Sequence, residues 1–247
     1  MLITGIMPVL ATLDYDSSRI EKIIILEGTD NSRIEKIIAL AAKKNIPVER
    51  RKRPYFDSII DKKDKSEGIS QGVIAEAKEF EYYDLRKILE DCKDKKDALI
   101  VILDEIQDPH NLGAVMRTCA AVNADGVVIS EKNSAKVNHT VMKASAGAIK
   151  SLKISLSGNI YKAIEMIKQS EFFVFGTSLK DSKSMYDVKM DCRAAVVFGG
   201  ESKGIRANIV RLCDELVKIP IPGNVESLNV SVSAGVILYE ILRQRKE

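Results

Sequence analysis

The chain has 247 residues, of which 45% are hydrophobic and 30% are charged, and its formal net charge is +3 at pH 7. This length can bury a core and allows one large domain or two modest ones. No apolar run approaches the roughly 18 residues of a membrane span, and Met1–Val9 lacks the layout of a secretory signal. We therefore expect a cytoplasmic protein. The net charge is too small to indicate nucleic-acid binding, so only local basic clusters can do so.

The cysteine and histidine content argues against a metal site. The four cysteines lie far apart in the sequence, and His110 and His139 are the only histidines. Zinc sites and redox motifs need closely paired ligands, which this pattern lacks. We expect reduced thiols and no bound metal.

The first 79 residues predict a small α/β domain, because short apolar runs alternate with a helical pattern. The expected elements are a strand at Ile23–Leu26, a helix at Ser32–Lys44 and strands at Ile46–Val48 and Val73–Ala77. The charged segment Asp91–Asp97 has almost no apolar residues, which is typical of a linker. We place the linker at residues 80–97 and a second domain at residues 98–247.

The second domain alternates strands and helices regularly, which predicts an α/β fold with a mainly parallel sheet and helices on both faces. The expected strands are Leu99–Leu103, Gly126–Ser130, Ser151–Ser155, Phe172–Phe175, Ala194–Phe198 and Leu216–Ile219. The expected helices are Asn111–Val122, Val141–Ala148, Tyr161–Lys168, Ile205–Leu212 and Asn229–Arg243.

Two glycine-containing loops, Gly199–Gly204 and Ile219–Gly223, each follow an apolar strand. In open α/β sheets ligands bind just past the carboxyl ends of the strands, where such loops can form a pocket from backbone groups. Gly199–Gly204 has neither the dinucleotide fingerprint nor the Walker A spacing. The second loop leads into Ser227–Ser231, where Asn229 is either a helix cap or a polar group in the pocket.

The segment Asp108–Thr118 joins a buried strand to a helix. Asn111 stands where a helix cap would, and Arg117 falls outside the apolar stripe of the helix. An ordinary cap followed by a solvated arginine is one interpretation. The other is a phosphate site, because a basic side chain near a helix amino terminus at this sheet edge suits an anion.

One basic run, Arg50, Arg51, Lys52 and Arg53, stands in the first domain and is followed by Pro54, Tyr55 and Phe56. Such a run is commonly a solvated surface. Basic residues beside aromatic residues also suit RNA, whose bases stack on rings and whose phosphates take the positive charge. Both interpretations stay open.

Taken together, Asp108–Thr118, Val197–Gly204 and Ile219–Ser231 resemble, in order and spacing, the three signature motifs of the SpoU (TrmH-like) family of RNA ribose 2′-O-methyltransferases. The resemblance covers the whole chain after the linker. It implies a SPOUT-type fold with a carboxyl-terminal trefoil knot that forms the S-adenosylmethionine pocket. It also implies a homodimer with the active site near the subunit interface.

Chain length and the first domain are most similar to family members that methylate a guanosine of 23S rRNA near the peptidyl-transferase region. This similarity implies that the first domain binds RNA. Matching the motifs position by position implies a polar catalytic cluster of Asn111, Arg117, Glu201, Ser227 and Asn229. The residues implied at the cofactor are Thr177, Gly199, Gly200, Ile219 and Leu228.

The sulfonium of S-adenosylmethionine is already a strong methyl donor, so the protein must align a ribose 2′-hydroxyl with it and help to remove the proton. An arginine side chain stays protonated in proteins. We therefore interpret Arg117 as a group that binds phosphate and the developing alkoxide, and we leave the base unassigned.

Two alternatives remain. One is a tRNA guanosine 2′-O-methyltransferase, which the separate first domain disfavours. The other is an RNA-binding or ribosome-assembly protein without catalysis, which the set of Asn111, Arg117, Glu201 and Asn229 disfavours.

Overall fold

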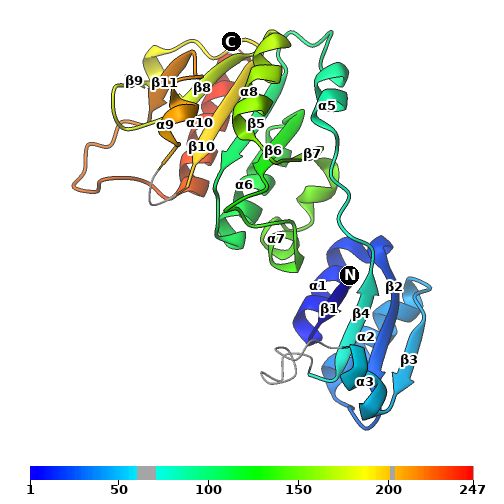
Figure 1. The fold of residues 1–247 in the computed structure, drawn as a ribbon. Coiled ribbons are helices and arrows are strands. Elements are labelled where there is room, and N and C mark those ends of the chain that lie inside the picture. Colours follow the sequence, from blue (N-terminus) through cyan, green and yellow to red (C-terminus); the bar gives the residue numbers. More distant parts are fainter. Residues whose placement is uncertain (60–70, 201–203, 247) are drawn as a thin grey trace. The chain divides into compact units, whose positions relative to one another are not determined.

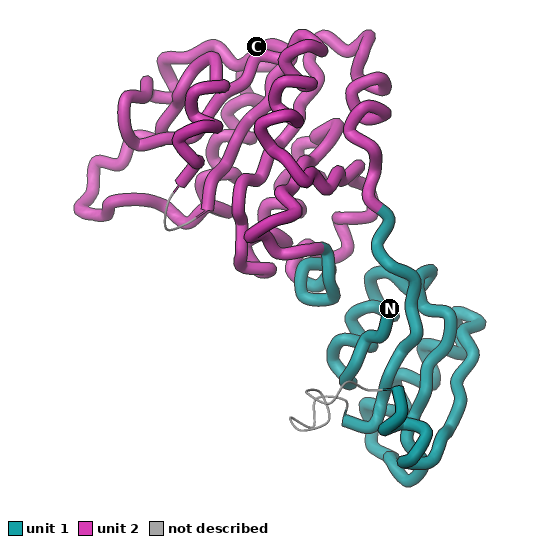
Figure 2. The backbone as a smooth tube through the Cα atoms, in the orientation of Figure 1, with its two compact units in different colours: residues 1–81, 137–143 teal, residues 82–136, 144–247 magenta. Residues whose placement is uncertain are grey.

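A computed structural model describes residues 1–59, 71–200 and 204–246. The chain forms two compact units, shown in different colours in Figure 2. The first comprises Met1–Glu81 with Val137–Lys143, and the second comprises Tyr82–Lys136 with Ala144–Glu247. None of the helices in the described ranges combines the length and the apolar character that crossing a membrane requires.

The first unit is built on a four-stranded sheet in the order β1-β4-β2-β3 (Figure 1). The strands are β1 (Leu2–Thr4), β2 (Ile20–Leu26), β3 (Val48–Arg51) and β4 (Val73–Ala77). Strand β4 is antiparallel to both β1 and β2, whereas β3 runs parallel to β2. The central strands β2 and β4 supply most of the buried apolar side chains of the sheet.

Helices cover both faces of this sheet, because β2 is apolar on both sides. Ile23 and Ile25 pack with helices α1 (Ile6–Asp16) and α2 (Ser32–Lys43). Ile24 faces the other way and packs with Phe56 of α3 (Arg53–Ile59). The α2 helix begins where predicted, since the Asn31 side chain accepts hydrogen bonds from the amides of Arg33 and Ile34.

Three elements of the first unit, β1, α1 and α3, were not predicted, and the strand expected at Ile46–Val48 is displaced. The observed strand, β3, begins at Val48 and runs to Arg51, so half of the basic run lies on a strand. Because β3 is an edge strand with a single neighbour, it needs little apolar alternation and leaves a weak signal.

The second unit contains a seven-stranded sheet in the order β7-β6-β5-β10-β8-β11-β9, in which every pair is parallel. The strands are β5 (Leu99–Asp104), β6 (Gly126–Ser130), β7 (Ile154–Ser157), β8 (Phe173–Thr177), β9 (Lys183–Ser184), β10 (Ala194–Gly199) and β11 (Glu215–Lys218). Strand β10 lies between β5 and β8. The chain therefore passes through both edge strands, β7 and β9, before it returns to the middle of the sheet as β10.

Helices lie on both faces of this sheet (Figure 1). One face packs against α5 (Leu85–Asp91), α8 (Ile160–Gln169) and the short α9 (Ala207–Val210). On the other face α10 (Val230–Gln244) packs against β10 and α6 (Pro109–Ala121). Helix α7 (His139–Ala144) belongs to the first unit except for Ala144. The parallel sheet with two helical layers confirms the predicted fold class; the trefoil knot stays a prediction.

The segment that we assigned to a linker, residues 80–97, contains helix α5. Asp84 caps the helix, because its side chain accepts a hydrogen bond of 2.9 Å from the amide of Arg86. Leu85, Ile88 and Leu89 are buried in the core of the second unit. The middle of the segment therefore contributes to the packing of that unit.

We predict that Phe56→Ala lowers the free energy of unfolding of the first unit by about 3–5 kcal/mol, because Phe56 is 1% exposed and fills the smaller apolar cluster. The matched control is Tyr55→Ala on the same helix, whose side chain is 38% exposed and whose removal should cost about 1 kcal/mol or less. Urea unfolding, followed by amide hydrogen exchange in β2 and β4, measures both. Equal losses for the two variants would contradict this packing.

Candidate active site

The predicted cofactor residues gather at the carboxyl edge of the second sheet. Gly199 ends β10 beside Asp104 of β5, and Thr177 ends β8 beside Val217 of β11. Ile219 directly follows β11. The Thr177 hydroxyl donates a hydrogen bond of 3.0 Å to the carbonyl oxygen of Val197, which ties the ends of β8 and β10 together. Neighbouring strands therefore present these residues along one edge.

The loop after β10 is packed backbone against backbone. A Cβ atom on Gly199 would lie 2.0 Å from the carbonyl carbon of Gly204, and one on Gly200 would lie 2.7 Å from the carbonyl oxygen of Glu105. The Gly204 amide donates a hydrogen bond of 2.8 Å to the Gly200 carbonyl, and Gly204 has a φ of +64°. Only glycine fits so close an approach without displacing a neighbour. The end of β10 therefore requires glycine.

An ion pair between the buried Asp104 and the half-buried Arg206 holds the returning end of this loop. The Asp104 carboxylate is 0% exposed, and it accepts hydrogen bonds from Nη2 of Arg206 at 2.6 Å and from Nε at 3.1 Å. The backbone amide of Arg206 also donates to this carboxylate, at 3.3 Å. The hydrogen bonds that Arg206 donates to the Asp104 carboxylate raise the pKa of Arg206 above its usual value. The sequence analysis did not identify Asp104 or Arg206 as site residues. The position of Asp104, a carboxylate at the end of an apolar strand, could have indicated it.

Glu105, the next residue after β5, has a φ of +60°, a left-handed conformation that is uncommon outside glycine. Three contacts hold it there. Its amide donates a hydrogen bond of 3.0 Å to Oγ of Ser130, its carboxylate accepts one of 3.2 Å from Asn133, and Nη1 of Arg206 lies 3.5 Å from the same carboxylate. The end of β5 is thus connected both to β6 and to the loop after β10.

Asn111 and Asn229, which are 118 residues apart in the sequence, are in direct contact. Nδ2 of Asn229 donates a hydrogen bond of 3.1 Å to Oδ1 of Asn111. Oδ1 of Asn229 meanwhile accepts a hydrogen bond of 2.9 Å from the Ser231 amide and so caps α10. This second bond sets the orientation of the Asn229 amide, which directs its donor group toward Asn111. The structure therefore unites two residues of the predicted catalytic cluster.

The prediction that Asn111 stands at the cap of α6 is wrong. Helix α6 begins at Pro109, and its cap is Asp108, whose Oδ1 accepts a hydrogen bond of 2.9 Å from the His110 amide. Proline fits the first helical position because its missing amide has no helical partner there. Asn111 lies within the first turn, so its side chain is available to Asn229.

Three further residues of the predicted sites, Arg117, Ser227 and Leu228, lie on α6 or just before α10. Arg117 is exposed on α6, about 120° around the helix from Asn111, and forms no hydrogen bond or ion pair with any residue in the described ranges. Ser227 is exposed and Leu228 is half-buried in the segment before α10. Glu201 lies outside the described residues.

The basic run of the first unit is largely paired with carboxylates. Arg50 lies 2.7 Å from Asp30, Arg51 lies 2.7 Å from Glu49, and Arg53 lies 3.1 Å from Asp57. All three pairs are exposed. The Arg51 guanidinium also lies 5.2 Å from the centre of the Tyr55 ring.

Phe56, in contrast, is buried in the core. Of the two aromatic residues after the basic run, Tyr55 alone therefore offers an exposed ring for a base.

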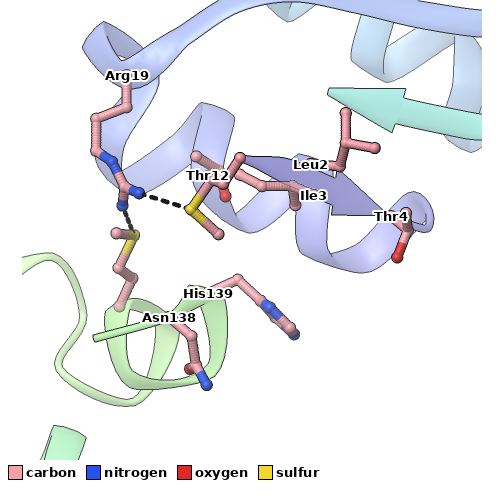
Figure 3. Close-up of a pocket in the computed structure, with 9 residues that line it drawn as sticks. Leu2, Ile3, Thr4, Thr12, Arg19, Asn138 and His139 are labelled. Atoms are coloured by element: carbon pink, nitrogen blue, oxygen red, sulfur yellow. Dashed lines mark hydrogen bonds between the residues drawn. The ribbon is translucent and has the colours of Figure 1, made fainter. Parts of the chain in front are cut away.

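The first unit also contains a pocket of about 160 Å³, drawn in Figure 3. The guanidinium of Arg19 contacts the sulfur atoms of Met1 and Met142 there, at 3.3 and 3.9 Å. None of the predicted site residues lines this pocket. Elsewhere, the described part of the chain contains no group of three or more His, Cys, Asp or Glu side chains that could hold a metal ion.

Two family models match the sequence. The SpoU rRNA Methylase family matches residues 98–239, and the family described as RNA 2′-O ribose methyltransferase substrate binding matches residues 2–83. The first match contains the Asn111–Asn229 pair and the loop after β10. The second covers the first sheet with its helices.

Individual proteins show the same similarity. The chain is 32% identical over 245 residues to the 23S rRNA (guanosine-2′-O-)-methyltransferase RlmB of Escherichia coli strain K12, which covers 99% of this chain and 98% of that protein. The A. aeolicus TrmH/SpoU tRNA modifying enzyme matches with a TM-score of 0.56 and 32% identity, over 66% of this chain and 82% of that chain.

The SpoU methyltransferase AviRb from Streptomyces viridochromogenes, solved in complex with the cofactor AdoMet, matches with a TM-score of 0.69. Its identity is 20%, and the match covers 100% of this chain and 90% of that chain. The shared fold thus extends over both units. By sequence and by fold, this chain belongs to the SpoU rRNA methylase family.

Proposed function

We propose that this protein transfers the methyl group of S-adenosylmethionine to the ribose 2′-hydroxyl of a guanosine in 23S rRNA. The observation that carries the proposal is the Asn111–Asn229 hydrogen bond, which unites two distant motifs beside the sheet edge that ends in Gly199. The match to the Escherichia coli rRNA enzyme over 99% of this chain, both units included, supports rRNA rather than tRNA as the substrate.

The residues at this edge fit S-adenosylmethionine. Gly199 and Gly200 carry no side chain and pack against the backbone of Gly204 and Glu105, so main-chain groups form the loop at this edge. Backbone groups of Thr177, Gly199, Gly200, Ile219 and Leu228 would hold the cofactor. When bound, its sulfonium supplies an activated methyl group.

The protein's own task is to hold and orient the ribose. In the proposed mechanism the amides of Asn111 and Asn229 fix the position of the sugar, with Ser227 and Glu201 completing the polar cluster. Arg117 binds a substrate phosphate and stabilises the negative charge that develops on the 2′-oxygen. Positioning of this kind can lower the barrier by roughly 7–11 kcal/mol.

We also propose that the protein acts as a homodimer. On α10, Val232 and Tyr239 are 51% and 53% exposed and lie two turns apart, which places them on one face of the helix. This helix packs against α6, which carries Asn111 and Arg117. Association through this apolar face would bring the second protomer close to the polar cluster.

The first unit would bind RNA through Arg50, Arg51, Lys52 and Arg53. Their exposed ion pairs do not prevent this, because a surface pair contributes only about 0–1 kcal/mol and a phosphate can replace the carboxylate. The Tyr55 ring beside Arg51 offers a stacking surface in the same place.

We expect the wild-type protein with S-adenosylmethionine to methylate unmodified 23S rRNA, and Arg117→Ala to lower kcat by about 100-fold or more, because a stabiliser of the developing charge is lost. Calorimetry should show unchanged cofactor affinity in this variant. The matched control is Arg211→Ala, which removes another exposed arginine of the same unit and should stay active. Lost cofactor affinity in Arg117→Ala would refute the role of Arg117, and an inactive wild type would refute the function.

A second prediction concerns Asn229→Asp. Aspartate caps a helix as well as asparagine does, so stability should be retained. It cannot donate to Oδ1 of Asn111, so we expect kcat to fall about tenfold, the effect of losing one hydrogen bond of about 1.4 kcal/mol. The control is Asn31→Asp at the cap of α2. Equal activity of both variants would show that the Asn111–Asn229 bond has no role in the reaction.

A third prediction is that replacing Arg50, Arg51, Lys52 and Arg53 together with alanine weakens RNA binding and makes it less dependent on salt. In a plot of the logarithm of the RNA association constant against the logarithm of the salt concentration, the slope should become shallower by about 0.7 for each lost contact to single-stranded phosphate. Replacing four exposed cations at α2, Arg33, Lys36 and Lys43 of the helix and Lys44 at its carboxyl cap, controls for charge alone. An unchanged slope would exclude the basic run from the RNA contact.

A further inference from the structure

A groove of about 590 Å³ lies on the second unit between the start of α5, the end of β7 and the start of α8. Its volume falls within the range of ligand sites, about 300–1,000 Å³. None of the residues that motif resemblance places at the catalytic site lines it. Its lining combines aromatic, cationic and apolar side chains.

The groove has the chemistry that a nucleotide needs. Tyr82 and Tyr83 supply aromatic rings, and the Tyr83 side chain is 45% exposed. Leu85 and Ala163, both buried, add apolar surface, and Arg86 and Lys162 add positive charge. The one carboxylate in the lining, Asp84, already accepts a hydrogen bond from the Arg86 amide as the cap of α5. Rings can stack on a base while the cations bind its phosphates.

The shape of the groove is fixed by backbone contacts. The Tyr83 amide donates a hydrogen bond of 2.7 Å to the carbonyl of Ile154, which attaches the segment before α5 to β7. The Asn159 side chain accepts a hydrogen bond of 3.3 Å from the Lys162 amide and so caps α8. The tyrosines and Lys162 are therefore carried by elements that are anchored in the sheet, which limits the ordering cost of binding.

The groove lies at the same edge of the sheet as the candidate active site. The register pairs Gly199 with Asp104 and Ser130 with Ser157, and the Glu105 amide donates to Oγ of Ser130. These positions form one row across the ends of four strands, with Ser157 in the lining of the groove. Strand β7 is three strand spacings, or about 14 Å, from β10, which ends in Gly199. An RNA chain whose target ribose lies at the active site would reach the groove with a nucleotide a few positions away.

We propose that this groove binds a nucleotide of the RNA substrate a few positions from the one that is methylated, with the base against Tyr83 and its phosphates at Arg86 and Lys162. The proposal rests on the proposed function, because it assumes RNA as the substrate. It assigns part of RNA recognition to the catalytic unit itself, in addition to the basic run of the first unit.

The test uses the full chain, S-adenosylmethionine and the 23S rRNA fragment that the wild type methylates. The variants are Tyr83→Ala and the double variant Arg86→Ala/Lys162→Ala. Each should raise KM for the RNA by about fivefold or more. Tyr83→Ala removes the stacking of one base, and the double variant removes the two cations that bind phosphate. The kcat and the cofactor affinity should not change. Ultraviolet cross-linking should join RNA to the peptide that contains Tyr82 and Tyr83.

Matched controls are Tyr186→Ala, an exposed tyrosine outside the groove, and Lys93→Ala/Lys96→Ala, two exposed lysines before β5 at the opposite edge. Unchanged KM in the groove variants, or an effect of equal size in the controls, would overturn the proposal. A fall in kcat alone would also overturn it, since that result indicates an indirect effect on the active site. An inactive wild type would instead contradict the proposed function, and cross-linking would still report whether RNA occupies the groove.

Discussion

The candidate active site depends on one close backbone contact, between the end of β10 and the chain at Gly204 and Ile205. A Cβ atom on Gly199 would lie 2.0–2.3 Å from atoms of these two residues, so no other side chain fits. The Asp104–Arg206 pair holds the returning chain in place. A buried carboxylate must be paired, because a buried charge without its partner costs about 3–5 kcal/mol. The pair therefore specifies where the loop after β10 can lie.

The polar residues are arranged around this contact. Helix α10 begins at the Asn229 cap, and the same side chain donates to Asn111 of α6. The sequence could identify both residues, because each lies in a motif at the end of a strand. It could not show that they touch, since that depends on how α6 and α10 pack on one face of the sheet. Asp104 and Arg206 were missed because neither stands in a glycine motif.

The fold was predictable where burial on both sides of a strand leaves an uninterrupted apolar run, as in β5, β6 and β10. It was not predictable where few residues are buried. The edge strand β3 includes Arg50 and Arg51, which we had placed in a basic run after the expected strand Ile46–Val48. In α5 the apolar residues Leu85, Ile88 and Leu89 have helical spacing, but charged neighbours favoured the interpretation as a linker. The first helix, α1, includes Pro8, which obscured its helical pattern.

The central claim is that backbone groups at the ends of β8, β10 and β11 hold the methyl donor beside the Asn111–Asn229 pair. A crystal structure of the protein with S-adenosylmethionine tests it most directly. The account predicts the cofactor in contact with the backbone of Thr177, Gly199, Ile219 and Leu228, with its methyl group directed toward the two asparagines. A cofactor bound at any other part of the chain, or with its methyl group directed away from Asn111 and Asn229, would contradict the account.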